Sequence, residues 1–150
     1  MKAVIFDLDH TLFAADEALY DGALDLLAIL RRLGVQIAGL SNRDHRILVR
    51  LEEAGARSYF AHILCADQIA DNPIEPKDAA GVRSVLERLG VLPENTVLVS
   101  HAHSDILLGK DAGLSRTIGV THGTDSAAPL REAGADHIVD NMPAVLDVIG

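Results

Sequence analysis

The sequence predicts an α/β fold, a three-layer Rossmann-like parallel sheet with helices on both faces. Short apolar runs alternate with amphipathic stretches of helical period along the chain. Such alternation is typical of parallel strands joined by helices. Polar residues also follow several of the apolar runs directly, and open α/β sheets carry their functional sites at the ends of strands.

The expected strands are short apolar runs, as buried strands of a parallel sheet should be. In chain order they are Ala3 to Phe6, Val35 to Leu40, Thr96 to Val99, Arg116 to Val120 and His137 to Val139.

The expected helices lie between these strands and after the last of them. They are Gly22 to Leu33, Asp44 to Ala54, Asp78 to Leu89, Asp105 to Ala112, Ala127 to Ala133 and Pro143 to Ile149. Leucines recur at helical spacing in the first, and Val82, Val85, Leu86 and Leu89 do so in the third. Glycine ends or follows five of them, at Gly34, Gly55, Gly90, Gly113 and Gly134. The segment Asp71 to Pro76 is the expected mobile loop.

Composition indicates one globular domain, residues 1–150. Apolar residues make up 49% of the chain and charged residues 23%. The formal charge of −9 argues against binding to nucleic acid or to an anionic membrane. The single cysteine, Cys65, excludes an internal disulfide. Asp7 comes too soon for a signal peptide, and no apolar run approaches the ~20 residues that span a bilayer. We therefore expect a soluble cytoplasmic protein.

The first strand ends in the sequence Asp7-Leu8-Asp9-His10-Thr11. Side chains at positions i and i+2 of an extended segment share a face, so Asp7 and Asp9 can converge on one ligand. Two such carboxylates suit a nucleophile paired with a general acid/base, or a divalent cation site. The alternative is an acidic turn without a chemical role.

Three further strand ends or helix starts carry polar residues. Ser41 and Asn42 follow the second strand, where Ser41 could cap the next helix or donate to a phosphate. Lys77 precedes a helix and could be either a site cation or a solvated surface charge. The stretch Ser100 to Asp105, with His101 and His103, leaves the strand that begins at Thr96.

These pieces, in this order, resemble the haloacid dehalogenase superfamily, most of whose members are magnesium-dependent phosphatases. Asp7 to Leu12 is similar to the family's first motif, Leu40-Ser41-Asn42 to its second and Lys77 to its third. Ser104 to Gly113 is similar to the helix after the fourth motif, and Thr117 to Thr121 and Ala133 to Asp136 match the end of the family pattern.

The resemblance implies a role for each matched residue. Asp7 would form an aspartyl-phosphate, and Asp9 would be the general acid/base. Thr11, Ser41, Asn42 and Lys77 would bind the substrate phosphate. The carboxylates of Asp7 and Asp105 and the main-chain carbonyl of Asp9 would hold Mg²⁺. The expected substrate is a phosphorylated small molecule or macromolecule.

The fourth motif departs from the family pattern. Ser100 stands in place of the usual Gly, and His101 in place of an Asp that binds the metal. Imidazole is a poor ligand for Mg²⁺, so His101 could favour another divalent ion such as Mn²⁺ or Zn²⁺, or could simply be hydrogen-bonded. Lys77 also lies one residue later than the family Lys.

The departure leaves alternative functions open. One is a catalytically impaired relative that binds a phosphorylated ligand or protein. Another is a metal-free dehalogenase, which the presence of Asp9 disfavours.

The family's cap domain is missing from the expected elements. Only 22 residues separate Thr11 from Gly34, and most of them belong to the first helix. The resemblance therefore implies a capless core with an open site, which makes a homo-oligomer more plausible than usual.

Overall fold

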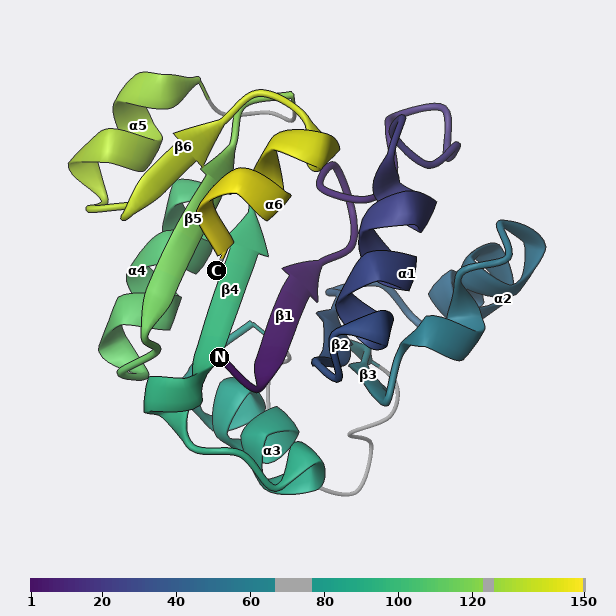
Figure 1. The fold of residues 1–150 in the computed structure, drawn as a ribbon, viewed down its shortest axis with the longest axis horizontal. Helices are drawn as coiled ribbons and strands as arrows, with labels where there is room; N and C mark the ends of the chain where they lie inside the picture. The colour runs from purple at the N-terminus through teal and green to yellow at the C-terminus, as the bar shows by residue number, and fades with distance from the viewer. Residues whose placement is uncertain (67–76, 123–125, 150) are drawn as a thin grey trace.

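The computed structural model describes residues 1–66, 77–122 and 126–149, and these form a six-stranded parallel sheet (Figure 1). Its order is β3-β2-β1-β4-β5-β6. The strands are β1 (Ala3–Asp7), β2 (Gln36–Leu40), β3 (His62–Leu64), β4 (Thr96–Ser100), β5 (Arg116–Val120) and β6 (His137–Val139). The predicted α/β class is confirmed.

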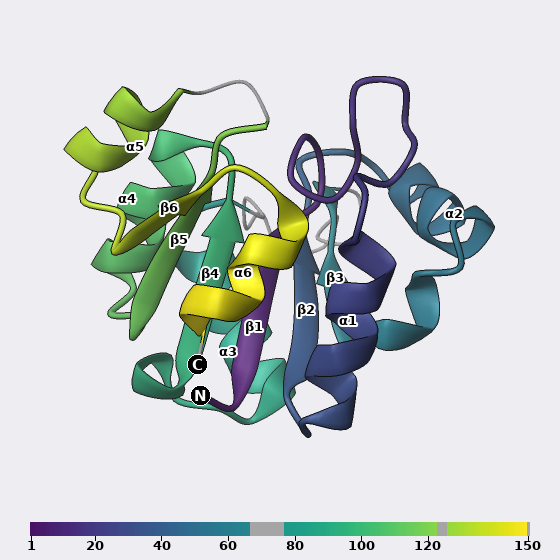
Figure 2. The same cartoon turned by 45° about the horizontal axis from the view of Figure 1, so that its top comes forward.

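Helices connect the strands on both faces. They are α1 (Ala23–Arg32), α2 (Arg46–Glu53), α3 (Ala79–Leu89), α4 (His103–Asp111), α5 (Ala127–Glu132) and α6 (Met142–Ile149), with 3₁₀ turns η1 (Arg57–Tyr59) and η3 (Pro93–Asn95). Figure 2 shows α1 and α6 together in front of the sheet, with α3 behind it.

The two faces of β1 divide the core. Val4 and Phe6 pack into an apolar cluster with residues of α1 and α6, whereas Ala3 and Ile5 pack with residues of α3. This alternation follows from the two-residue period of a strand. All five residues of β1 are buried, as a strand covered on both faces requires.

The structure differs from the sequence expectation at several boundaries. β3, a three-residue edge strand, was not predicted. β1 and β4 each run one residue further, to Asp7 and Ser100, and α4 begins at His103, not at Asp105. The predicted loop, Asp71 to Pro76, lies outside the described residues.

The register of the strands sets the position of the site. Asp7 of β1 pairs with Leu40 of β2, and Phe6 pairs with Val99 of β4. Consequently Asp7, Ser41 and Ser100 all lie at one edge of the sheet, where the three central strands end.

Candidate active site

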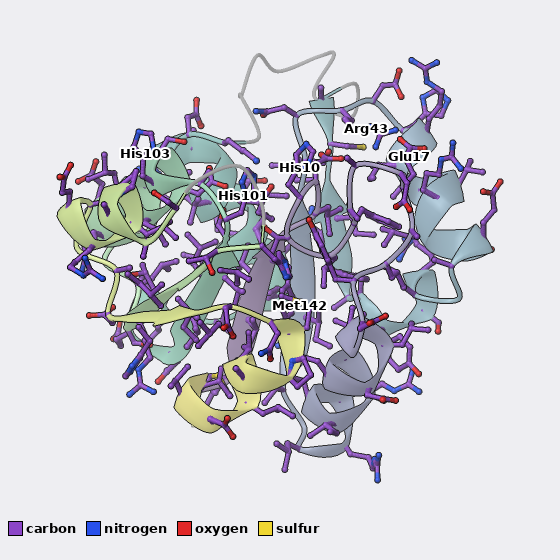
Figure 3. All side chains as sticks on the ribbon, turned by 90° about the horizontal axis from the view of Figure 1, so that it is seen from above. His10, Glu17, Arg43, His101, His103 and Met142 are labelled. Carbon is purple, nitrogen blue, oxygen red and sulfur yellow. The ribbon has the colours of Figure 1, made fainter. Side chains whose placement is uncertain are left out.

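The candidate site lies at the carboxyl edge of the sheet, where β1, β2 and β4 end. Figure 3 shows the molecule from above, with its side chains. This is the point where the strand order reverses, with β2 and β4 on opposite sides of β1. Ligands bind at such switch points in open α/β sheets. The side chain of Asp78 caps α3 by accepting a hydrogen bond from Gly81 N at 2.8 Å, which fixes the start of the helix that follows Lys77.

Asp7 is the most enclosed charged group of the site, with a side chain that is 1% exposed. Its Oδ2 accepts a hydrogen bond from Thr11 Oγ1 at 3.0 Å and lies 3.1 Å from His101 Nε2. Its Oδ1 lies 2.5 Å from Lys77 Nζ. Beyond this ion pair, Oδ1 has no hydrogen-bond partner among the described residues. A buried carboxylate oxygen with so few partners is suited to meet a ligand.

Asp105 brings a second carboxylate beside Asp7. Its Oδ2 accepts a hydrogen bond from Ser100 Oγ at 2.7 Å and lies 3.3 Å from Lys77 Nζ. The Ser100 hydroxyl is also 3.4 Å from Asp7 Oδ2, so it stands between the two carboxylates. Lys77 therefore pairs with two carboxylates at once, and with 17% of its side chain exposed it is not a solvated surface charge.

The pKa values of the two carboxylates shift in opposite directions, although burial raises both. Burial alone would raise the pKa of Asp7, but the hydrogen bond to His101 and the charge of Lys77 outweigh it and hold the pKa below its ordinary value. Burial and the charge of Asp7 raise the pKa of Asp105. Burial would lower the pKa of Lys77, yet the charges of Asp7 and Asp105 raise it. Asp7 is thus kept ionised, as a nucleophile must be.

Asp9 lies on the open side of the site, with a side chain that is 23% exposed. Its Oδ2 accepts a hydrogen bond from Ser41 Oγ at 2.9 Å, and its Oδ1 pairs with Arg43 Nη1 at 3.1 Å. Ser41 Oγ also accepts a hydrogen bond from Arg43 N. Sequence reasoning missed Arg43, because nothing in the chain indicated that the residue after Asn42 turns back to Asp9.

Thr11 is fully buried and positions other groups of the site. Its hydroxyl donates to Asp7 Oδ2 and accepts a hydrogen bond from the His101 N–H at 3.0 Å. Its main-chain oxygen lies 2.9 Å from His122 Nε2, whose ring stacks on Tyr20. Asn42 is exposed and lies outside this hydrogen-bonded cluster of described residues. The predicted phosphate-binding roles of Thr11 and Asn42 stay predictions.

His101 contacts one carboxylate oxygen of Asp7, Oδ2, and Lys77 contacts the other, Oδ1. Its side chain is 9% exposed, and its ring meets the ring of His10 edge-on, with centroids 5.5 Å apart. His103 is exposed at the start of α4, and Figure 3 shows it well apart from His10. The two loop histidines of the sequence therefore have different surroundings: His101 is buried against Asp7, whereas His103 is exposed.

The carboxylates of Asp7 and Asp105 are suited to bind a divalent cation that has few protein ligands. Among the described residues, no group of three or more His, Cys, Asp and Glu side chains is arranged to hold a metal. Mg²⁺, however, is commonly held by one or two carboxylates and several waters. Asp7 Oδ1, which has no partner among the described residues beyond the ammonium of Lys77, and the nearby carboxylate of Asp105 meet that description.

No described helix is long and apolar enough to cross a membrane.

In the described part of the loop that joins β1 to α1, residues 8–22, there is no helix or strand, only isolated bridges at Asp9, Phe13 and Leu19. A cap domain is therefore missing at this position, as predicted.

Comparison with known proteins identifies relatives by sequence and by fold. The chain is 30% identical over 128 residues to phosphoglycolate phosphatase 1 of Pseudomonas aeruginosa, a match that covers 85% of this chain and 46% of the relative. It is 29% identical over 119 residues to a phosphorylated carbohydrates phosphatase of Thermotoga maritima, covering 79% of this chain and 54% of the relative. The chain thus spans about half the length of the curated relatives it matches.

A solved structure supports the fold over the whole chain. A haloacid dehalogenase-like family hydrolase of Streptococcus pneumoniae superposes with a TM-score of 0.85 at 15% identity, covering 100% of this chain and 99% of the other. The sequence pattern of haloacid dehalogenase-like hydrolases matches residues 11–113. This chain therefore belongs to the haloacid dehalogenase-like hydrolase family.

Proposed function

We propose that the protein hydrolyses phosphate monoesters through a covalent intermediate on Asp7, with residues 1–150 acting as one domain. The observation that carries the proposal is the state of Asp7, a buried carboxylate kept ionised by His101 and Lys77 at the end of β1. The phosphatase names of the relatives add support and favour a phosphorylated small molecule as substrate, although a phosphorylated macromolecule would fit an open site.

The proposed reaction has two steps. In the first, a carboxylate oxygen of Asp7 attacks phosphorus while the bond to the leaving oxygen breaks, and Asp9 gives its proton to that oxygen. In the second, Asp9 takes a proton from water as the water oxygen attacks the aspartyl-phosphate. Inorganic phosphate leaves, and both carboxylates return to their starting states.

Neighbouring groups would bind the transferring phosphoryl. A dianion and a carboxylate about 4 Å apart repel by on the order of 8 kcal/mol at an effective dielectric near 20. Lys77 offsets part of this repulsion from its place between Asp7 and Asp105. Ser41, which donates to Asp9 in the free protein, would redirect its hydroxyl to the phosphoryl group.

A divalent cation, Mg²⁺ or another ion such as Mn²⁺ or Zn²⁺, would supply the remaining positive charge. The carboxylates of Asp7 and Asp105 and the main-chain carbonyl of Asp9 would hold it. The imidazole of His101 next to Asp7 is the reason to include the softer ions. We place the activity in the cytoplasm.

The direct test is hydrolysis of a generic aryl phosphate by the purified protein with Mg²⁺, Mn²⁺, Zn²⁺ or a chelator. We expect turnover that depends on one of the ions and stops with the chelator. Folded protein that shows no turnover with any ion would overturn the proposal.

His101 favours a second candidate, a family member that binds a phosphorylated ligand without efficient turnover. The substitution His101→Asp distinguishes this candidate from an efficient phosphatase, because it adds an oxygen ligand at the position of the fourth motif where the family pattern has an Asp. If His101 limits the reaction, kcat/KM with Mg²⁺ should rise by about tenfold or more.

His101→Asn is the matched control for this prediction, since it removes the imidazole without adding a charge. Mg²⁺ should raise the melting temperature of His101→Asp more than that of His101→Asn, because only the former gains a carboxylate. If the two variants respond alike in rate and in melting temperature, His101 does not restrict the metal.

A further inference from the structure

A chain of ion pairs links Asp9 to Glu17 and Arg50. Arg43 Nη1 lies 3.1 Å from Asp9 Oδ1, and Arg43 Nη2 lies 2.9 Å from Glu17 Oε1. The other oxygen of Glu17, Oε2, lies 2.5 Å from Arg50 Nη2. The carboxylate of Glu17 therefore bridges two guanidinium groups, with one oxygen on each.

Two clefts meet at this bridge. A cleft of about 340 Å³ includes Asp9, His10, Phe13, Glu17 and Arg43 in its lining. A larger one of about 610 Å³ is lined by Glu17, Arg43 and Arg50, among others. Figure 3 shows Arg43 and Glu17 together, on the other side of His10 from His103. Because Asp9 would protonate the leaving oxygen, the remainder of the leaving group would extend into the smaller cleft and toward this bridge.

Glu17 holds an unusual backbone conformation. Its φ is +66°, in the left-handed region that non-glycine residues rarely adopt. The turn around it is closed by hydrogen bonds from Ala14 N to Ala18 O and from Glu17 N to Ala14 O. Such conformations persist where the surroundings hold them, and they gather at ligand-binding sites. Here the two arginines are what hold the side chain.

We propose that Arg43 and Arg50 form a subsite for a second anionic group on the leaving group of the substrate, and that Glu17 occupies this subsite in the free protein. The proposal rests on the proposed phosphatase function. It names the class of substrate, a phosphate monoester whose leaving group carries a carboxylate or a further phosphate.

The charges explain why an anion would be selected. A ligand carboxylate that takes the place of Glu17 keeps both guanidinium groups paired, and the displaced Glu17 side chain, already 31% exposed, turns to solvent. A neutral group in the same place would supply no charge in place of Glu17. Arg43 would then keep its pair with Asp9, and Arg50 its longer pair with Glu53 at 3.5 Å, but the two guanidinium groups would lose the carboxylate that they share. Arginine also binds carboxylate and phosphate through several N–H groups at once.

Phosphate esters of ω-hydroxy acids of increasing chain length, each compared with its primary amide, test the proposal. At the best length we expect kcat/KM for the acid to exceed that for the amide by about tenfold to a hundredfold. Arg50→Gln should lower this acid-to-amide ratio by about tenfold. Glu17→Gln should raise it by about threefold or more, because the competing carboxylate is removed. A merely structural role of either residue would lower the rates of both esters together.

Arg32→Gln is the matched control, because Arg32 is an exposed arginine at the far end of α1. It should leave the ratio at the wild-type value. Bisphosphates of diols, compared with the monophosphates, show whether the subsite takes a phosphate in place of a carboxylate. An acid-to-amide ratio near one in the wild type, or a ratio that Arg50→Gln does not change, would overturn the subsite.

Failure of the proposed phosphatase function can be distinguished from failure of the subsite. If wild-type protein hydrolyses no ester at all, the proposed function fails, and calorimetric binding of the same acid and amide esters then decides the subsite. Tighter binding of the acid that Arg50→Gln removes would support it, and equal binding would refute it.

Discussion

Asp7→Asn is expected to abolish phosphate ester hydrolysis, lowering kcat/KM by about 10⁴-fold or more. The amide has nearly the size of the carboxylate and can still accept a hydrogen bond from Thr11. It lacks the negative charge with which Asp7 would attack phosphorus. The variant should fold, because Lys77 keeps Asp105 as a counter-charge.

A covalent readout makes this prediction specific. Wild-type protein quenched in acid during turnover should carry a phosphoryl group on Asp7, which mass spectrometry detects, and Asp7→Asn should carry none. Asp111→Asn is the matched control, since Asp111 is an exposed aspartate at the end of α4. Turnover by Asp7→Asn near the wild-type rate would show that another group is the nucleophile.

Much of the fold was predictable because most strands and helices have a recognisable pattern in their own local sequence. The five predicted strands are apolar runs, and the predicted helices repeat apolar residues at helical spacing and end near glycines. β3 was missed because its three residues, His62–Leu64, are too few to show a period. It becomes a strand by pairing with β2, a non-local contact.

The main groups of the site were predictable for a topological reason. Residues that follow parallel strands must meet at one edge of the sheet, which is why Asp7 and the stretch that ends at Asp105 were expected together. Lys77 follows no predicted strand and was expected there because it resembles the third motif of the family. The ion pairs bring the three residues together. Their chemical roles remain proposals.

Other contacts depend on side-chain directions that no sequence period encodes. Thr11 turns inward to Asp7 and to the His101 N–H, although its position in the first motif suggested contact with a phosphate. Arg43 reaches back to Asp9, and Glu17 reaches Arg43 from a turn with a left-handed residue. Because turns and rotamers decide these contacts, they could be found only in the structure.

Lys77→Met should lower the free energy of unfolding at neutral pH by about 3 kcal/mol, because it leaves two neighbouring carboxylates without their shared cation. This loss is at the lower end of the range for breaking a buried ion pair, because 17% of the lysine side chain is exposed. Lys110→Met is the matched control. Lys110 pairs with Asp136 at 3.7 Å, with both side chains about two-fifths exposed, and its loss should cost at most about 1 kcal/mol.

The loss in Lys77→Met should also depend on pH in a defined direction. Without Lys77, the pKa of Asp105, already raised above its ordinary 3.8, rises further, and that of Asp7 rises with it. A carboxyl group whose pKa is higher in the folded state destabilises the fold above its unfolded-state pKa and ceases to do so once it is protonated. The difference from wild type in urea unfolding should therefore shrink as the pH falls from neutral toward 3.8, the ordinary pKa of an aspartate.

Activity gives the second readout of the same substitution. Lys77 is the ammonium group closest to the proposed nucleophile, so Lys77→Met should lower kcat/KM by about 10²- to 10³-fold. Unfolding curves that match wild type at neutral pH, or a stability loss that does not change with pH, would contradict the shared ion pair. A stability loss with unchanged kcat/KM would instead confine Lys77 to balancing Asp7 and Asp105, and the transferring phosphoryl would then need its positive charge from the cation and Ser41.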